Sequence, residues 1–475
     1  MKKTIIFLIT IIMLLSSIKV DAQTTSFYEG EYIPNIWLNR KSPYDNLIYY
    51  SQARTFREIS TNNLAYCVEP FNNFYANQNY ESTLKPSNFT NEQIKNMTLI
   101  SHFGYGYKNH TDMKWYAITQ LLLWEVADPN GYYYFSSYKN GPAVNTFQNE
   151  INEIKTLVNN YKQSTSFNNQ TFYTTENESL TIIDYNNVLN SFSTTTDFVT
   201  ITNNTIKTKP LSVGNYTINL EKQSKVHNKP ILFYQSPSSQ KIMDIGDPEV
   251  INNKIHLNVI KTTTLITKKD DETNNNPQGD AHLTGAVFEL YTENNTKLET
   301  ITMDTLTKEI KNLPFGTYYI KEIKPGEGYK LNDKKHYFTV SKDSPTNEIE
   351  ISNQVIRKTI KIKKEYGHDN NFKPEQNISF NILDSNDNLI KTIITNELGE
   401  AEITLPYGKY KIVQLTTTEG YEKIKPLYFE ITSEESLSYN LKNYKIPVPN
   451  TSTKSLIDKI LEFIKDLLCG KKQYK

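Results

Sequence analysis

The first folded region of the chain has one cysteine that could do chemistry. The segment LAYCVEP at 64–70 contains Cys67, and the second of the two cysteines, Cys469, lies near the end of the 475-residue chain. A lone thiol is most often an inert core side chain. Three alternatives remain open: a hydrolase nucleophile with His102 or His110 as its base, half of an intermolecular disulfide, and half of an internal thioester with a glutamine.

The N-terminal segment indicates export. Lys2 and Lys3 precede the apolar run TIIFLITIIMLLSSI, and the segment ends with KVDAQ. A charged start, an apolar middle and a small residue at the end are typical of a secretory signal peptide, so we expect a leader at 1–22, cleaved after Ala22. The alternative is an uncleaved membrane anchor, but the apolar run is short for the roughly 20 residues that a membrane span needs.

The composition favours β structure and gives no sign of nucleic-acid binding. The formal net charge is +0, whereas nucleic-acid-binding proteins carry a basic excess. Aromatic and β-branched residues favour strands, and the abundant asparagines favour turns. No clustered His/Cys spacing and no Gly-rich phosphate loop stands out, so we expect no cofactor and no metal site. We therefore predict a mainly β, multi-domain protein.

The elements that would position Cys67 fall into two parts. The aromatic-rich stretch from 23 to about 165 contains the best helical patterns, at 113–127 and 144–161, because apolar residues recur there at three- and four-residue spacing. From about 166 to 258 the pattern changes to short alternating segments separated by Asn, Gly and Pro. That pattern predicts a β-sandwich.

An internal repeat follows. LPFGTYYIKEIKPGEGY at 313–329 returns as LPYGKYKIVQLTTTEGY at 405–421. The spacing is that of a small β-domain rather than of a solenoid unit, so we expect two tandem Ig-like sandwiches, at 259–355 and 356–445. The tail at 446–475 reads as a short amphipathic helix, because charged residues interrupt its apolar run and make a membrane span unfavourable.

Two segments carry a resemblance to a known family. AYCVEP at 65–70 and AITQLLLW at 117–124 resemble the two signature segments of the thioester domains of Gram-positive surface adhesins. LISHFGYGY at 99–107 is similar to the element between them. The resemblance covers about 23–258, and it implies an α+β head completed by a β-sandwich. It also implies an internal thioester between Cys67 and Gln120.

The residue types fit that chemistry. A Cys67 thiolate attacks the Gln120 carboxamide, ammonia leaves, and the stored acyl group can later acylate an amine. Such a bond must be kept dry until it reacts, and four aromatic residues near the motifs could exclude water, although ordinary core packing explains each equally well: Tyr66, Trp115, Tyr116 and Trp124. The acyl group is consumed, so we expect stoichiometric covalent binding and not an enzyme.

The two repeats resemble collagen-adhesin B-type domains, also called SpaA-like or prealbumin-like domains. That family joins a first-strand lysine to a last-strand Asn with the help of a buried Glu, which implies Lys268, Asn353 and Glu322 in the first repeat. Burial lowers the pKa of a lysine and raises that of a carboxylic acid, so a neutral amine could attack the amide while the acid shuttles protons. Lys269 is the near alternative, but it faces the other side of a regular strand.

The second repeat departs from that pattern. Lys364 and Asn443 take the lysine and asparagine positions, but Gln414 stands at the Glu position. Glutamine cannot shuttle a proton as a carboxylic acid does. The sequence therefore leaves two alternatives for this repeat, a crosslinked sandwich and one that is held by packing alone.

The chain end also has two interpretations. VPNTS at 448–452, followed by an apolar stretch and GKKQYK, resembles a degenerate sortase signal. The competing interpretation is an amphipathic helix that lies on a membrane surface or pairs with another protein. Either would associate the protein with the cell wall or the membrane.

Together these features favour a secreted cell-surface adhesin that binds a host or neighbouring-cell protein, or another amine-bearing ligand, through Cys67 and Gln120. The rival classes are a secreted cysteine hydrolase or acyl transferase and a non-covalent adhesin in which Cys67 is incidental. The ligand itself cannot be read from the sequence.

Overall fold

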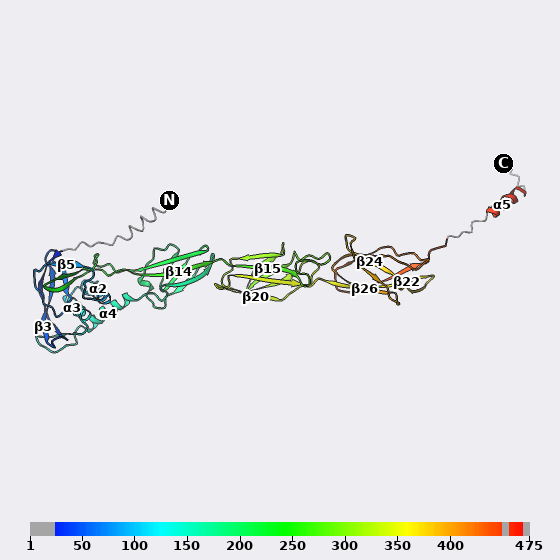
Figure 1. The fold of residues 1–475 in the computed structure, drawn as a ribbon. Helices are drawn as coiled ribbons and strands as arrows, with labels where there is room; N and C mark the ends of the chain where they lie inside the picture. The colour runs from blue at the N-terminus through cyan, green and yellow to red at the C-terminus, as the bar shows by residue number, and fades with distance from the viewer. Residues whose placement is uncertain (1–23, 449–455, 469–475) are drawn as a thin grey trace, which may run out of the picture. The chain divides into compact units, whose positions relative to one another are not determined.

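The computed structural model describes residues 24–448 and 456–468 of the chain. The chain divides into two compact units, Met1–Val259 and Ile260–Lys475. Strands make up most of the elements in both units, and helices gather in the first (Figure 1). The predicted mainly β, multi-domain fold is therefore confirmed. The expected leader at 1–22 and Cys469 lie outside the described residues, as does most of the VPNTS segment.

An eight-stranded antiparallel sheet forms the first layer of the N-terminal unit. Its order is β1-β5-β12-β13-β4-β3-β2-β6. The strands β12 and β13 enter the sheet between β5 and β4, although they lie far from both in sequence. The bounds are β1 (Thr24–Thr25), β2 (Phe27–Lys41), β3 (Ile48–Glu58), β4 (Leu64–Cys67), β5 (Tyr80–Thr83), β6 (Tyr132–Ser136), β12 (Phe233–Ser236) and β13 (Ser239–Asp244).

Three helices make the second layer of this part. They are α2 (Asn91–Phe103), α3 (Met113–Ala127) and α4 (Gln148–Lys162). Every residue of α3 from Trp115 to Trp124 is buried, as expected of a helix that is apolar all round. In Figure 1 the helices lie beside the strands of the sheet, and α3 contacts β2, β3, β4 and β6. The main core of the unit lies between these two layers.

A β-sandwich completes the N-terminal unit. One sheet has the order β8-β10-β9 and the other β11-β14-β7. Their facing side chains form a separate core that includes Ile206, Ile218 and Ile255. The bounds are β7 (Gln170–Thr175), β8 (Thr181–Ile183), η1 (Leu189–Ser191), β9 (Val199–Thr202), β10 (Thr205–Thr208), β11 (Gly214–Lys222) and β14 (Ile251–Ile260).

The second unit contains two β-domains, each built from two sheets. The first domain has the sheets β18-β15-β21 and β17-β16-β19-β20. Alternate residues of β15 are buried, as expected of a strand with one face on the core. The bounds are β15 (Thr263–Asp270), β16 (Val287–Thr292), β17 (Lys297–Thr302), β18 (Thr307–Lys311), β19 (Gly316–Lys324), β20 (Lys335–Val340) and β21 (Thr346–Asn353).

The second domain repeats this plan with one addition. Its sheets are β25-β24-β27-β28 and β23-β22-β26, with β29 on the other side of β22. The short strand β23 folds back on the end of β22 as a hairpin. The bounds are β22 (Arg357–His368), β23 (Asn371–Pro374), β24 (Ser379–Leu383), β25 (Leu389–Ile394), β26 (Glu400–Pro406), β27 (Gly408–Gln414), β28 (Leu427–Ile431) and β29 (Leu437–Tyr444).

First and last strands run parallel to each other in both domains. In the first, β15 pairs with β21, and Lys268 lies opposite Ile351. In the second, β22 pairs with β29, and Lys364 lies opposite Leu441. This pairing is what brings the start and the end of each repeat side by side.

The last described element is the helix α5 (Leu456–Leu468), which confirms the predicted C-terminal helix. Ile460, Leu461, Ile464 and Leu468 are exposed on it. Within residues 24–448 and 456–468, no helix is long and apolar enough to cross a membrane.

Candidate functional site

Cys67 is the last residue of β4 and lies inside the large sheet. It pairs with Ile242 of β13, and the next N–H group, that of Val68, donates to the Lys241 carbonyl at 3.0 Å. Cys67 forms no disulfide with a described residue and is only 1% exposed. Burial raises the pKa of the Cys67 thiol well above its ordinary value, and the charge of Arg40 opposes this only in part. The sheet therefore shields the Cys67 side chain from water and disfavours its charged form.

Gln120 of α3 lies directly against Cys67. Its Oε1 accepts a hydrogen bond from the Cys67 N–H at 3.0 Å, and its Nε2 donates to the Cys67 carbonyl at 2.7 Å. Gln120 is 1% exposed. The carboxamide is thus held in one orientation on the backbone of the cysteine, and two residues from separate parts of the sequence lie together in a dry site.

Tyr116 fixes α3 to the sheet one helical turn before Gln120. Its hydroxyl donates to the Ala65 carbonyl and accepts from the Phe56 N–H at 3.0 Å. Gly104, at the C-terminal end of α2, allows α2 and α3 to approach closely, because a Cβ there would lie 2.0 Å from the Thr119 Oγ1. A larger residue at this glycine would push α3, and Gln120 with it, away from its place.

The four aromatic residues expected around the thioester share one buried core cluster: Tyr66, Trp115, Tyr116 and Trp124. The rings of Tyr66 and Tyr116 stack at 4.6 Å, one residue from the cysteine and one turn from the glutamine. Trp115 instead stacks on His110 at 3.5 Å, and Trp124 lies under the Arg40 guanidinium at 5.0 Å. The two tyrosines therefore lie closest to the site in sequence and contacts, and the tryptophans extend the core along α3.

The first β-domain of the second unit buries a lysine, a glutamate and an asparagine together. Lys268 Nζ contacts Asn353 Oδ1, and it lies 3.3 Å from Glu322 Oε1. Asn353 Nδ2 donates to Glu322 Oε2 at 2.7 Å. The lysine and glutamate side chains are both 0% exposed. Burial lowers the pKa of Lys268, although Glu322 opposes the shift, so the environment favours the neutral amine that a nucleophile needs.

The second β-domain buries Lys364 and Asn443 at equivalent positions. Gln414 occupies the register position of Glu322, since Phe380 pairs with Gln414 as Phe288 pairs with Glu322. The Gln414 amide is engaged elsewhere, with the Thr416 carbonyl at 2.7 Å and the Ile424 N–H at 3.1 Å.

A carboxylate that the sequence reasoning missed lies beside Lys364. Glu375 Oε2 is 2.8 Å from Lys364 Nζ, and both side chains are buried. The overlooked signal is the segment YGHDNNFKPE, because an Asp-Asn turn between alternating residues predicts a hairpin that returns the chain to its own strand.

Family models match both parts of the chain. The thioester domain model matches residues 64–174, which include Cys67 and Gln120. The model of the prealbumin-like fold domain, SpaA, matches residues 263–355 and 358–445. The protein is a thioester-domain protein with two prealbumin-like domains. The resemblance drawn from the two short motifs and the repeat is thereby confirmed.

Solved structures with detectable similarity to this thioester-domain protein include three that represent both parts. The Bacillus anthracis TIE protein is 18% identical, with 89% of this chain and 84% of that chain covered and a TM-score of 0.37. The thioester domain of the Staphylococcus aureus TIE protein is 20% identical, with 50% and 99% covered and a TM-score of 0.38. The Streptococcus agalactiae minor pilin GBS52 is 16% identical, with 40% and 99% covered and a TM-score of 0.22. A comparison with curated proteins gives no match.

Arg40 of β2, in the N-terminal unit, is a second residue that sequence reasoning missed. Its guanidinium packs over the rings of Trp124 and Tyr49 and donates to Ser51 Oγ at 3.2 Å. Its positive charge favours the Cys67 thiolate. Nothing in the sequence marks this arginine, because its proximity to the cysteine arises only when the strands assemble.

Glu69 of the thioester domain ties the segment after Cys67 to β13. Its Oε2 accepts from the Lys241 N–H at 2.8 Å, and its Oε1 accepts from Lys241 Nζ at 2.8 Å and from Asn88 Nδ2 at 2.7 Å. The glutamate belongs to the YCVEP motif, so the motif contains a structural clamp as well as the thiol.

Neither candidate histidine is placed as a base for Cys67. His102 Nδ1 lies 3.0 Å from the Gly246 carbonyl, and its Nε2 lies 2.7 Å from Ser224 Oγ. His110 Nδ1 lies 2.8 Å from the Phe103 carbonyl. These contacts use the rings to join loops, which leaves the hydrolase alternative without its base among the histidines considered.

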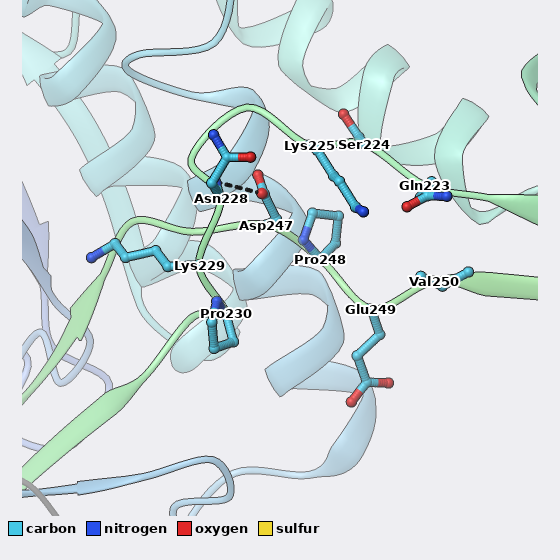
Figure 2. A pocket seen from close by; sticks show the side chains of 10 residues that line it. All are labelled: Gln223, Ser224, Lys225, Asn228, Lys229, Pro230, Asp247, Pro248, Glu249 and Val250. Atoms are coloured by element: carbon cyan, nitrogen blue, oxygen red, sulfur yellow. Dashed lines mark hydrogen bonds between the residues drawn. The ribbon is translucent and has the colours of Figure 1, made fainter. Parts of the chain in front are cut away.

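A surface pocket of about 380 Å³ lies away from the cysteine. Figure 2 shows its lining, in which the Asp247 side chain points toward Asn228 and bonds to its backbone N–H at 2.7 Å. Asp247 also accepts from the N–H groups of Val226 and His227. With His102 and His227 it forms a group of possible metal ligands. Asp247 and His102 hold the loops through these hydrogen bonds, whereas His227 Nε2 is buried without a hydrogen-bond partner.

Proposed function

We propose that the protein is a secreted surface adhesin whose thioester domain captures an amine-bearing ligand covalently. The bond would join Cys67 Sγ to the side-chain carbonyl carbon of Gln120. The ligand class is a protein on a host or neighbouring cell, or another amine-bearing molecule, whose amine would attack the thioester. The prealbumin-like domains would form the stalk that presents the head.

The proposed chemistry has two balanced steps. First, the Cys67 sulfur adds to the Gln120 carboxamide carbon, the C–N bond breaks, and the thiol proton leaves with the nitrogen as ammonia. Second, a ligand amine attacks the thioester carbon, an amide forms, and Cys67 leaves as a thiolate that is reprotonated. The acyl group is used once, so the protein is a reagent that binds and not an enzyme that turns over.

One observation carries this proposal: the two hydrogen bonds between the Gln120 carboxamide and the Cys67 backbone, in a site where both residues are buried. Burying a primary amide is costly unless its polar atoms are satisfied, and here the backbone of the cysteine satisfies both. Fixing the amide beside the thiol supplies the orientation that an intramolecular acyl transfer requires. Excluding water preserves the product.

The stalk proposal rests on the trio in the first prealbumin-like domain. We infer that Lys268 Nζ attacks the Asn353 amide with Glu322 as proton shuttle, which releases one ammonia and leaves an isopeptide bond. Because β15 and β21 are the first and last strands of the domain, this bond would close the sandwich against pulling. Such a closure suits a stalk that links a cell to a bound partner.

Intact-mass spectrometry of the mature protein tests the head. The thioester predicts that one ammonia is missing from the thioester domain, that Cys67→Ala restores it, and that methylamine adds to the native protein but not to this variant. Cys469→Ala is the matched control, since it removes the other thiol and should leave both results unchanged. A native head with a free, alkylatable thiol and an intact Gln120 amide would overturn the proposal.

The same samples separate the rival functions. Repeated turnover of a small ester or peptide that is lost in Cys67→Ala would identify a hydrolase or acyl transferase. Ligand binding that survives Cys67→Ala at full strength, and that denaturant reverses, would identify a non-covalent adhesin.

A further inference from the structure

The second prealbumin-like domain contains a buried reactive trio that differs from the first in its acid. Glu375 Oε2 contacts Lys364 Nζ at 2.8 Å and Asn443 Nδ2 at 3.0 Å. One carboxylate oxygen therefore touches both the amine that could attack and the nitrogen that could leave. The lysine and glutamate side chains are 0% and 1% exposed.

The lysine and the asparagine occupy the same register positions in both domains. Lys268 lies opposite Ile351 in the parallel strand pair, and Asn353 is two residues further along β21. Lys364 lies opposite Leu441, and Asn443 is two residues further along β29. The strands therefore present a lysine and an asparagine to each core at the same register positions. The contacts differ, because Lys268 Nζ contacts Asn353 Oδ1, whereas Lys364 Nζ donates to the Glu365 carbonyl at 2.9 Å.

The hairpin of β22 and β23 delivers the acid in the second domain. Asp369 and Asn370 have positive φ angles of 48° and 63°, which is the turn that a two-residue hairpin favours. The hairpin returns the chain so that the Glu375 N–H donates to the Lys364 carbonyl at 2.9 Å. Gly399 leaves room for this return, because a Cβ there would lie 2.3 Å from the Lys364 carbonyl oxygen.

The carboxylate itself is firmly oriented. Its Oε1 accepts from the Thr418 N–H at 2.9 Å. The Asn443 Nδ2 donates also to Thr417 Oγ1 at 2.7 Å, whereas Asn443 Oδ1 is buried without a hydrogen-bond partner. A buried ion pair beside an unsatisfied amide oxygen is an unfavourable arrangement. Formation of a Lys364–Asn443 amide, with a proton left on Glu375, would remove both buried charges.

We propose that Glu375 is the catalytic proton-transfer group that forms an isopeptide bond between Lys364 and Asn443. It would take the role proposed for Glu322 in the first domain, where the second domain has Gln414. The inference goes beyond the proposed function, and it does not depend on the thioester. Burial lowers the pKa of Lys364, while Glu375 opposes the shift, which agrees with an amine that can lose its proton in this core.

The proposed reaction balances without a further reagent. Glu375 takes a proton from the Lys364 ammonium, and the neutral Nζ attacks the Asn443 Cγ. A second proton passes from Nζ through the carboxyl group to Nδ2 as the Cγ–Nδ2 bond breaks. Ammonia leaves, the new bond joins Nζ to Cγ, and Glu375 ends as a neutral acid.

Peptide mapping by mass spectrometry of the full mature protein tests this inference. The digest should contain one branched peptide that joins the Lys364 and Asn443 segments and lacks one ammonia. Glu375→Gln keeps the size of the side chain but cannot relay a proton, so the bond should form at least about 100-fold more slowly. Glu365→Gln is the matched control, since it neutralises the adjacent carboxylate outside the trio.

Three outcomes would overturn the inference: separate Lys364 and Asn443 peptides in the wild type, an unchanged crosslink in Glu375→Gln, and a loss in Glu365→Gln equal to that in Glu375→Gln. If Glu375→Gln does not fold, Glu375→Asp is the second test. The shorter side chain should slow the formation of the isopeptide bond, which is followed in pulse-labelled protein. An unchanged rate would contradict proton transfer by Glu375. Mapping assigns each lost ammonia to its own peptide, so failure here is distinct from failure of the thioester.

Discussion

Lys268 and Lys269 are neighbours in β15, and their side chains point to opposite faces of the sheet. The Nζ of Lys268 contacts Asn353 Oδ1 in the core, whereas that of Lys269 lies 2.6 Å from Glu350 Oε1 at the surface. Only the first can reach the asparagine. The alternation of a regular strand thus selects one of two adjacent lysines for the proposed crosslink.

Lys268→Ala should therefore restore one ammonia to the first prealbumin-like domain and destabilise it. We expect a loss of about 3–5 kcal/mol in unfolding free energy, because the variant removes a long-range covalent link and leaves Glu322 buried without its cation. Intact mass and urea unfolding measure the two effects. Lys269→Ala is the control and should shift stability by less than about 1 kcal/mol. Equal behaviour of the two variants would contradict the crosslink.

The sequence predicted that Lys268 and Lys269 face opposite sides of a strand, and it predicted the helix at 113–127. Both predictions rest on local periodicity. Lys268 alternates with its neighbours along a strand, and α3 has the bounds of its apolar pattern. The order of the strands was less accessible, since β12 and β13 return to β4 from far along the chain. Contacts that depend on this return, such as those of Glu69 with Lys241, could not be read from the motif.

The acid of the second domain shows where residue-by-residue matching stops. The repeat alignment placed Gln414 at the Glu position, and Gln414 pairs with Phe380 as Glu322 pairs with Phe288. The alignment thus directed attention to a position without a carboxylate. Glu375 reaches Lys364 by way of a hairpin that the first domain does not have in this form. The carboxylate beside the lysine thus comes from the segment after β23 and not from the strand equivalent to β19. Only the assembled strands reveal that Lys364 has this partner.

Tyr116→Phe should impair thioester formation without removing either reacting group. The hydroxyl joins α3 to Ala65 and Phe56 of the sheet, so its loss leaves buried backbone groups unsatisfied, at a cost of about 1–3 kcal/mol. We expect a lower thermal midpoint and a smaller fraction of molecules that lack the ammonia. Tyr132→Phe changes an exposed tyrosine and serves as the control. A fully formed thioester in Tyr116→Phe would show that the sheet alone positions Gln120.

Arg40→Met should slow the reaction of the thioester with methylamine. Cys67 must leave as a thiolate, and the positive charge of the half-buried Arg40 favours that form. Loss of about 1.4 kcal/mol of this stabilisation would slow aminolysis about tenfold. The rate is followed by intact mass over time. Lys41→Met, which removes an exposed charge on the next residue of β2, should react at the wild-type rate, and a similar slowing there would point to a general charge effect.

Acid should destabilise the N-terminal unit through His102. Burial lowers the pKa of this histidine to about 4 from its ordinary 6.5, against opposing contributions from Gly246 and Asp247. The unfolded chain therefore binds a proton between pH 6.5 and 4 that the folded chain does not bind, so stability is lost as the pH falls through this range. The loss should reach about 3 kcal/mol, since one pKa unit corresponds to about 1.4 kcal/mol.

Urea unfolding of the protein at several pH values measures that slope. His102→Gln cannot take up the proton, so its unfolding free energy should be lower at neutral pH and depend less on pH below 6.5. His256 lies exposed in β14, and His256→Gln should keep the wild-type slope. If His102→Gln retains the full acid dependence, the proton taken up on unfolding belongs to another group, and the contacts of His102 with Gly246 and Ser224 do not keep its ring neutral.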